Sequence, residues 1–274
     1  MTNPSIFNEL LIWPMLNVLV AVYKILISLG VPFALGFSII ILTIIIRFIL
    51  YPLTASQLKA SKKMQELNPH LARLKEKHKN DAKTLQQETM KLYKEHGVNP
   101  AAGCLPVLVQ LPIIWGLYSL LQQIVHLTPQ VINKVVYSDY LKISKQWDPN
   151  FFGVSLASNP SHLISTVGPV VLLIPIITGA LQFIQSKMLF AKPPEPGELV
   201  KDLEKKKSDD FATAFQSQSL YIFPIMIGFF SYTFPIGLSL YWNTFTIFGI
   251  IQQYKISGLG GLEVWVNKIY GKRK

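Results

Sequence analysis

Four long blocks of apolar residues, separated by polar and charged stretches, divide the chain. They cover residues 34–53, 104–125, 163–186 and 216–254, and roughly 17 to 25 apolar residues are enough for a helix to cross a bilayer. The last block is too long for one span, and residues 232–237 at its middle, Tyr-Thr-Phe-Pro-Ile-Gly, carry a Pro/Gly turn signal. The pattern therefore predicts two helices joined by a tight loop there, and five membrane spans in total.

The apolar segment before the first block, residues 6–29, has polar side chains at helical spacing. Asn17, Lys24 and Ser28 fall on one face of a helix over this range. A helix with one polar and one apolar face tends to lie in the membrane interface rather than across it. We therefore expect residues 1–33 to form an interfacial amphipathic helix, with a sixth span as the alternative.

Composition supports a membrane protein and excludes an ordinary soluble domain. The 274 residues are 50% hydrophobic and only 15% charged, and the mean hydropathy is +0.34. The apolar residues occur in blocks rather than in the narrow stripes of a soluble helical protein. The expected fold class is an all-α polytopic membrane protein, and its single cysteine, Cys104, excludes a disulfide within the chain.

Basic residues indicate how the predicted spans are oriented. Lysine and arginine gather in the connection 56–97, in the connection 188–215 and in the tail 255–274, whereas the other side of the membrane receives only Lys24, Lys134, Lys142 and Lys145. Loops rich in lysine and arginine stay in the cytoplasm. We therefore expect both connections and the C terminus to be cytoplasmic, and the N terminus with its interfacial helix to lie outside.

The first basic connection, residues 56–97, is expected to be a helical hairpin. Leu67, Leu71 and Leu74 recur at helical spacing, residues 78–81 break the pattern, and residues 85–93 resume it. Beside a membrane such a hairpin suits ribosomal RNA, an acidic protein or anionic headgroups, and a solvated spacer is the plainer interpretation. The connection 188–215, with its prolines and balanced charges, is expected to be a mobile loop.

Motifs of common catalytic and cofactor sites are missing from the sequence. It contains no GxxxxGK[ST] phosphate loop, no HExxH, no GxSxG and no GxGxxG, and its five histidines are dispersed. We therefore expect no catalytic residues, no cofactor and no metal site, and we do not expect an enzyme.

Arg47 is the unusual residue, because it lies within the first apolar block. No aspartate or glutamate occurs in any of the predicted spans to pair with it, and a charge at this depth is expensive without a partner or water. Thr43 precedes it by one turn, and other spans contribute further polar groups: Gln110, Gln182, Gln185, Trp242, Asn243 and Thr244. The pattern predicts a hydrated cavity open to the cytoplasm, although ordinary helix packing would also explain the uncharged groups.

Several motifs, in order along nearly the whole chain, resemble those of the YidC/Oxa/Alb membrane protein insertases. They are Thr43 to Leu53; the charged hairpin; residues 99–106, Asn-Pro-Ala-Ala-Gly-Cys-Leu-Pro; residues 110–113, Gln-Leu-Pro-Ile; residues 151–153, Phe-Phe-Gly; Pro175 with residues 185–188, Gln-Ser-Lys-Met; residues 234–243, Phe-Pro-Ile-Gly-Leu-Ser-Leu-Tyr-Trp-Asn; and residues 252–254, Gln-Gln-Tyr. The resemblance implies a hydrophilic groove formed by a five-span core, here residues 34–254. It assigns the positive charge of this groove to Arg47 and substrate contacts to Thr43 and Trp242. Gln185 resembles the polar groove residue of the third span, with Gln182 as the alternative.

The resemblance also implies a function, a location and partners. It predicts an insertase and chaperone that places newly made proteins in a bacterial plasma membrane without hydrolysing nucleotide. Its expected partners are nascent membrane proteins and lipids, with the ribosome and the Sec translocon as further candidates and no small-molecule substrate. The alternative from another class is a channel or secondary transporter for an anionic solute, although the sequence shows no internal repeat of the kind common in transporters. A third possibility is a membrane anchor for ribosomes.

Overall fold

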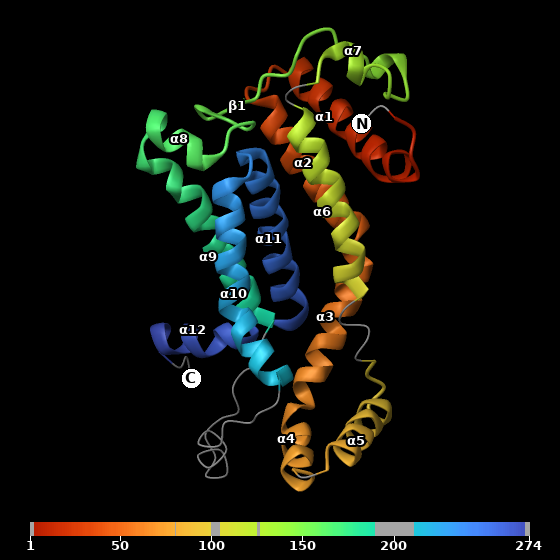
Figure 1. Cartoon of the computed structure of the whole chain (residues 1–274), viewed down its shortest axis with the longest axis vertical. Helices are drawn as coiled ribbons and strands as arrows, with labels where there is room; N and C mark the ends of the chain where they lie inside the picture. The colour runs from red at the N-terminus through yellow and green to blue at the C-terminus, as the bar shows by residue number, and fades with distance from the viewer. Residues whose placement is uncertain (1–2, 80, 100–104, 125–126, 190–210, 272–274) are drawn as a thin grey trace. The chain divides into compact units, whose positions relative to one another are not determined.

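The computed structural model describes residues 3–79, 81–99, 105–124, 127–189 and 211–271, and most of them are helical (Figure 1). The helices, in chain order, are η1 (Asn8–Ile12), α1 (Trp13–Ser28), α2 (Ala34–Ile49), α3 (Tyr51–Glu66), α4 (Asn68–Lys77), α5 (Ala82–Glu95), α6 (Leu105–Ile124), α7 (Pro129–Ile132), η3 (Asp139–Leu141), α8 (Pro160–Val167), η4 (Pro169–Leu172), α9 (Leu173–Leu189), α10 (Phe211–Thr233), α11 (Ile236–Ser257), η5 (Gly260–Leu262) and α12 (Glu263–Tyr270). The strands β1 (Asn150–Phe151) and β2 (Val154–Ser155) form an antiparallel pair. The predicted mobile loop lies almost wholly outside the described residues, as does the side chain of Gln110.

The chain forms two compact units, and several helices contribute to both. The first unit comprises Met1–Leu50, Leu108–Gln182 and Pro224–Phe248, and the second comprises Tyr51–Val107, Phe183–Phe223 and Gly249–Lys274.

The core of the first unit forms where α1 packs on α2. Leu16, Leu19, Val20 and Tyr23 recur at helical spacing along α1 and are all buried. Helix α6 also approaches this segment, because a Cβ added to Gly116 would lie 2.8 Å from a methyl group of Leu11. Close packing at a small residue is typical of helices in membranes.

The polar face predicted for the N-terminal helix contacts protein. Asn17 is buried, and its amide donates to the Val135 carbonyl and accepts from the Tyr137 amide at 3.1 and 2.7 Å. Lys24 donates to the carbonyls of Tyr140 and Lys142. These hydrogen bonds explain why Asn17 and Lys24 are polar without requiring that they contact lipid headgroups. The interfacial placement itself stays a prediction, since Asn8–Ser28 is long and apolar enough to cross a bilayer.

Two of the predicted apolar blocks are interrupted. The first bends by 62° between α2 and α3 at Leu50, because Pro52 lacks an N–H and its ring clashes with the carbonyl of the preceding turn. The third is divided at Gly168, whose φ of +89° is a conformation that suits glycine, and Pro169 then begins a new helical segment. Pro169–Leu189 is long and apolar enough to cross a bilayer, and α2 with α3 passes the same test as a bent pair.

The tight loop predicted within the last apolar block is present. Helix α10 ends at Thr233 and α11 begins at Ile236. The first amides of α11 donate to loop carbonyls, Ile236 to Ser158 at 3.0 Å and Gly237 to Leu156 at 2.9 Å. These bonds satisfy N–H groups that a helix start otherwise leaves unpaired.

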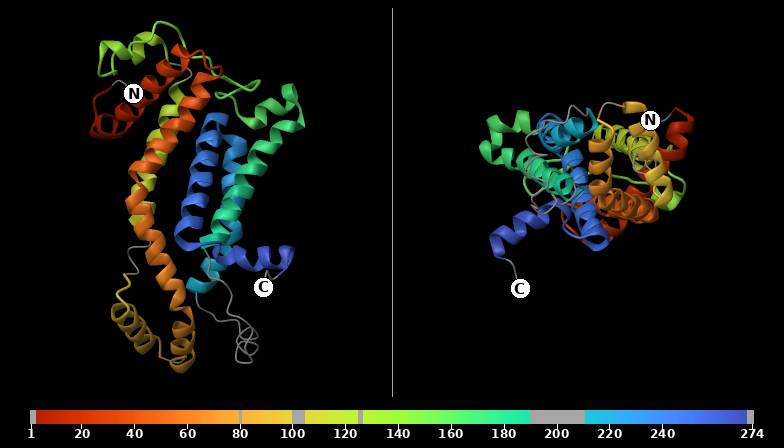
Figure 2. Two further views of the ribbon diagram at one scale, coloured as in Figure 1. Left: turned by 180° about the vertical axis from the view of Figure 1, so that it is seen from behind. Right: turned by 90° about the horizontal axis from the view of Figure 1, so that it is seen from below.

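The second unit contains the basic connection for which the sequence predicts a hairpin. Helices α4 and α5 lie side by side in Figure 1 and in the left view of Figure 2. A cavity of about 300 Å³ between them is lined by Leu74 and Leu92 together with charged side chains such as Arg73 and Lys91. The Asp81 side chain caps α5 by accepting from the Thr84 amide at 3.0 Å.

Candidate functional site: a buried arginine between helices α2 and α11

Arg47 of α2 is held by uncharged groups of α11. Its side chain is 4% exposed, and one guanidinium nitrogen, Nη2, donates to the backbone carbonyl of Phe245. The guanidinium carbon lies 3.3 Å from the centroid of the Phe245 ring and 5.8 Å from that of Phe248. Aromatic faces attract cations through their quadrupole, so a carbonyl dipole and two rings take the place of a carboxylate.

The arrangement leaves the positive charge of Arg47 unneutralised. Its Nε is buried without a hydrogen-bond partner among the described residues, and the ion pairs in that part of the chain do not include Arg47. Burial without a counter-ion is costly. The guanidinium is covered by protein here, with the Phe245 ring against it, and the hydrated cavity expected around it stays a prediction.

Thr43 lies one turn before Arg47 and is also buried. Its hydroxyl donates to the Ile39 carbonyl at 2.7 Å, and its side chain is 1% exposed. This local bond satisfies the hydroxyl proton, while the oxygen can still accept a hydrogen bond. Thr43 therefore lies on the same helix as Arg47 and is buried like it, but the structure shows no bond between the two side chains.

Trp242 lies on α11 three residues before Phe245, and both are half-buried. Residues three apart in a helix are neighbours on its surface, so Trp242 lies within about one turn of the residue that covers Arg47. The next residue, Asn243, has a buried side-chain oxygen without a hydrogen-bond partner among the described residues. This part of α11 thus presents an aromatic ring and an unsatisfied acceptor close to the Arg47 contact.

Gln182 and Gln185 both lie on α9 and are half-buried. Neither amide forms a hydrogen bond within the described part of the chain, so both keep donors and acceptors for other molecules. Gln182 belongs to the first unit with Arg47, whereas Gln185 belongs to the second.

Sequence reasoning missed Phe245 and a chain of buried hydroxyls. Thr178 and Ser231 lie 3.1 Å apart at their oxygens, and Ser231 and Ser239 lie 2.8 Å apart. Beside them, the approach of α9 to α10 depends on glycine, since a Cβ on Gly228 would lie 3.3 Å from the Pro175 carbonyl. Small and hydroxyl-bearing residues in apolar helices often mark helix contacts in membranes. This pattern could have predicted the buried hydroxyls, but it could not have predicted the role of Phe245.

The apolar helices define the chain as a helical membrane protein. Residues 26–259 match the family model described as 60Kd inner membrane protein. The chain therefore belongs to this family, that of the YidC/Oxa/Alb insertases.

Curated relatives carry insertase names. The chain is 36% identical over 226 residues to "Membrane protein insertase YidC" of Fusobacterium nucleatum, covering 82% of this chain and 87% of the relative. It is 34% identical to "Membrane protein insertase MisCA" of Bacillus subtilis, covering 81% of this chain and 70% of the relative. It is 32% identical to "Inner membrane protein ALBINO3, chloroplastic" of Arabidopsis thaliana, covering 86% of this chain and 49% of the relative.

A solved structure has a similar fold. It is titled "Active YidC insertase crystal structure with the first transmembrane domain resolved", and the similarity has a TM-score of 0.55 at 25% sequence identity. The match covers 92% of this chain and 47% of the other.

Proposed function

We propose that this chain inserts newly made membrane proteins by receiving acidic residues of a crossing segment at Arg47. The insertase names of its relatives support the general function. The observation that carries the proposed mechanism is the buried guanidinium, which contacts a carbonyl and an aromatic ring in place of a carboxylate. A charge kept without a counter-ion remains available to an incoming one.

The expected attraction between Arg47 and an acidic residue of the substrate is strong enough to affect insertion. Two opposite charges about 4 Å apart attract by roughly 1 kcal/mol in water and roughly 4 kcal/mol at an effective dielectric constant near 20. An interaction of this strength stabilises a polar segment during its crossing without trapping it. The remaining driving force is the burial of apolar substrate segments in lipid, about 25 cal/mol per Å², so nucleotide hydrolysis is not needed.

Binding at Arg47 requires movement of Phe245. The ring lies against the guanidinium, and a rotation of its side chain would uncover the charge without breaking the backbone of α11. Thr43, Trp242 and Gln182 would then line the hydrophilic groove. Their spare acceptors and amide donors suit a polypeptide backbone whose own hydrogen bonds are unmade during crossing.

The remaining parts of the proposal concern the setting. We place the five-span core, residues 34–254, in a bacterial plasma membrane, with the N terminus outside and the C terminus cytoplasmic. Nascent membrane proteins and lipids are its partners, and the basic α3–α5 region is the surface for a ribosome or the Sec translocon. The distribution of lysine and arginine supports this orientation.

The test compares charge with side-chain shape at position 47. Arg47→Ala should reduce insertion of a single-span model protein whose crossing tail carries aspartate or glutamate by about tenfold, as expected for about 1.4 kcal/mol of lost attraction. Arg47→Lys should retain most activity at matched protein levels, although a lysine stacks less well on Phe245. Neutralising the acidic tail residues should remove most of the difference between the wild type and Arg47→Ala.

Two controls make the result specific. Lys24→Ala removes a cation that donates to backbone carbonyls, and any insertion defect that it causes should be the same for acidic and neutral tails. Phe245→Leu removes the aromatic cover and should leave the dependence on tail charge intact. A defect of Arg47→Ala that is the same for acidic and neutral tails would contradict the electrostatic role.

A further inference from the structure

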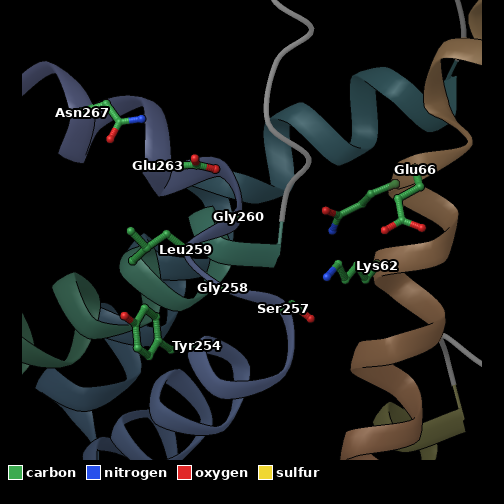
Figure 3. A pocket seen from close by; sticks show the side chains of 10 residues that line it. Lys62, Glu66, Tyr254, Ser257, Gly258, Leu259, Gly260, Glu263 and Asn267 are labelled. Atoms are coloured by element: carbon green, nitrogen blue, oxygen red, sulfur yellow. The ribbon is translucent and has the colours of Figure 1, made fainter. Parts of the chain in front are cut away.

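A second cavity lies wholly within the second unit and is separate from the residues assigned to substrate. Its volume is about 600 Å³, within the range of sites for small molecules. Lys62 and Glu66 of α3 form one wall, and Tyr254, Ser257, Glu263 and Asn267 lie on the other (Figure 3).

The walls of this cavity are joined by close contacts. The Gln65 side-chain amide donates to the Leu189 carbonyl, which connects α3 to the end of α9. Gly260 has a φ of +53° and lies so close to the Met188 carbonyl that a side chain would not fit. The ammonium of Lys187 lies 5.3 Å from the centroid of the Trp265 ring. The cavity is therefore lined by the ends of α3 and α11, by η5 and by α12, and the end of α9 contacts its walls.

The cavity is lined by one positive side chain, Lys62, and by two negative ones, Glu66 and Glu263. Lys62 and Glu66 are one helical turn apart, a spacing at which lysine and glutamate commonly pair, yet neither forms an ion pair within the described residues. The Lys62 ammonium points into the gap in Figure 3. Across it, the Ser257 hydroxyl oxygen is buried and has no hydrogen-bond partner in the described part of the chain.

A small zwitterion would match Lys62 and Glu66, because its negative group can bind the lysine while its positive group binds the glutamate. A phosphate group accepts hydrogen bonds from an ammonium and a hydroxyl, such as those of Lys62 and Ser257. A carboxylate, such as that of Glu66, accepts hydrogen bonds from a primary ammonium. A phosphoethanolamine group carries both charges, separated by two carbons. We propose that the cavity binds the headgroup of phosphatidylethanolamine, with its phosphate at Lys62 and Ser257 and its ammonium at Glu66.

The surroundings favour a lipid headgroup over a peptide. The cavity lies where α9 and α11 end, and these ends carry Lys187 and Lys255. Tyr254 is 59% exposed and Trp265 is 47% exposed. Aromatic and basic side chains gather at the level of lipid headgroups, where one end of each side chain is apolar and the other is wet.

The test measures lipid binding to the purified full-length protein in detergent, without any substrate protein. Native mass spectrometry should show phosphatidylethanolamine binding about tenfold more tightly than phosphatidylglycerol, which has no ammonium, and more tightly than phosphatidylcholine, whose ammonium cannot donate. Lys62→Gln and Glu66→Gln should each weaken the binding of phosphatidylethanolamine about tenfold. Lys63→Gln and Glu76→Gln, at exposed positions that do not line the cavity, should leave it unchanged.

The other outcomes overturn the proposal. Equal affinity for the three lipids, or insensitivity to Lys62→Gln and Glu66→Gln, excludes the headgroup site. Full occupancy by soluble glycerophosphoethanolamine or inorganic phosphate at the same concentrations indicates a water-soluble ligand. Capture of a nascent chain, rather than lipid, by a photo-crosslinker at position 62 indicates a peptide site. Because no insertion is measured, failure of the lipid site leaves the Arg47 mechanism standing, and the reverse also holds.

Discussion

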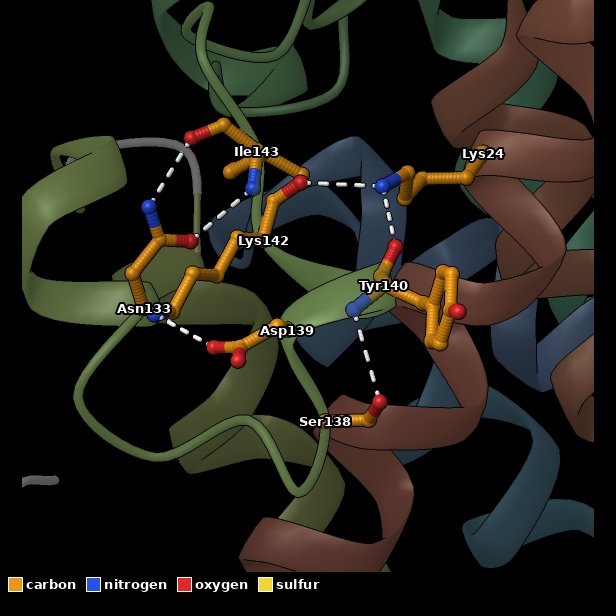
Figure 4. A network of polar contacts seen from close by, with 7 residues as sticks. All are labelled: Lys24, Asn133, Ser138, Asp139, Tyr140, Lys142 and Ile143. Atoms are coloured by element: carbon orange, nitrogen blue, oxygen red, sulfur yellow. Dashed lines mark hydrogen bonds and ion pairs between the residues drawn. The ribbon is translucent and has the colours of Figure 1, made fainter.

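The segment from Thr128 to Ser158 and the helices α3 to α5 are both polar, but they are held in opposite ways. The first has little regular structure, yet polar side chains fix its backbone: Asn133 bonds to both the amide and the carbonyl of Ile143 at 2.9 Å, and Lys24 bonds to two further carbonyls (Figure 4). Asn17 of α1 adds two bonds from outside the segment. Side-chain bonds to backbone groups thus replace regular structure there.

The helices α3 to α5 have regular backbone bonds and few bonds between side chains. The ion pair between Lys79 and Glu76 spans 3.8 Å, and both side chains are more than half exposed. Surface pairs of this kind contribute little. The first region therefore has a fixed shape, whereas exposed charged side chains of the second, such as Lys79 and Glu76, can rearrange around a partner.

The largest expected effect concerns the sides of the membrane on which the two regions lie. In a background lacking Cys104, a cysteine at exposed Tyr137 should react with an impermeant thiol reagent in intact cells, whereas a cysteine at exposed Ala72 should react only after lysis. The basic residues of α3 to α5 should keep that region inside. Labelling of position 72 from outside would reverse the proposed orientation.

A smaller effect is expected from the bonds that fix the first region. Asn17→Ala leaves the Val135 carbonyl and the Tyr137 amide without their partner in a buried site, and each such loss costs about 1 to 3 kcal/mol. We expect the free energy of unfolding to fall by about 2 to 6 kcal/mol, measured by thermal or denaturant unfolding in detergent. The matched control is Asn150→Ala at an exposed position. A similar loss in both variants would show that the Asn17 bonds are not what fixes the segment.

The smallest effect concerns the cap of α5. Hydrogen bonds from the Thr84 side chain and amide lower the pKa of Asp81. Because the folded pKa is below the unfolded one, the stabilisation is fully present above the unfolded pKa and is lost as the pH falls through the folded pKa. The Thr84 amide resonance should therefore shift in acid. Asp81→Asn, which keeps an acceptor at the cap but cannot titrate, should abolish this shift, and a shift that persists in the variant would assign it to another group.

Some of the fold could be predicted from local sequence. The loop between α10 and α11 follows from a Pro/Gly signal inside an overlong apolar block, and the bend at Leu50 has its cause in Pro52. The division at Gly168 has an equally local signal, the Gly-Pro pair at residues 168–169, which the hydrophobic pattern alone concealed.

The candidate site was predictable only in part. The unusual position of Arg47 is visible because a charge stands in an apolar run, but its partner is a backbone carbonyl at residue 245, and every residue has a carbonyl. Which one meets the guanidinium depends on how α2 packs on α11. The same applies to Asn17, whose polarity predicted contact with headgroups, whereas its partners are backbone groups 118 and 120 residues away.

The uncompensated charge of Arg47 also bears on how well a membrane holds its voltage. If a polypeptide crosses past Arg47 as proposed, the guanidinium would repel protons and sodium ions that follow the same path. Fixed positive groups exclude cations in this way in selective pores. Moving one elementary charge through 100 mV releases about 2.3 kcal/mol, and a repulsion of about 1 to 4 kcal/mol at close range is of the same order. Under the proposed mechanism, an insertase with such a residue would admit acidic peptide segments and resist the cation leak that would discharge the cell.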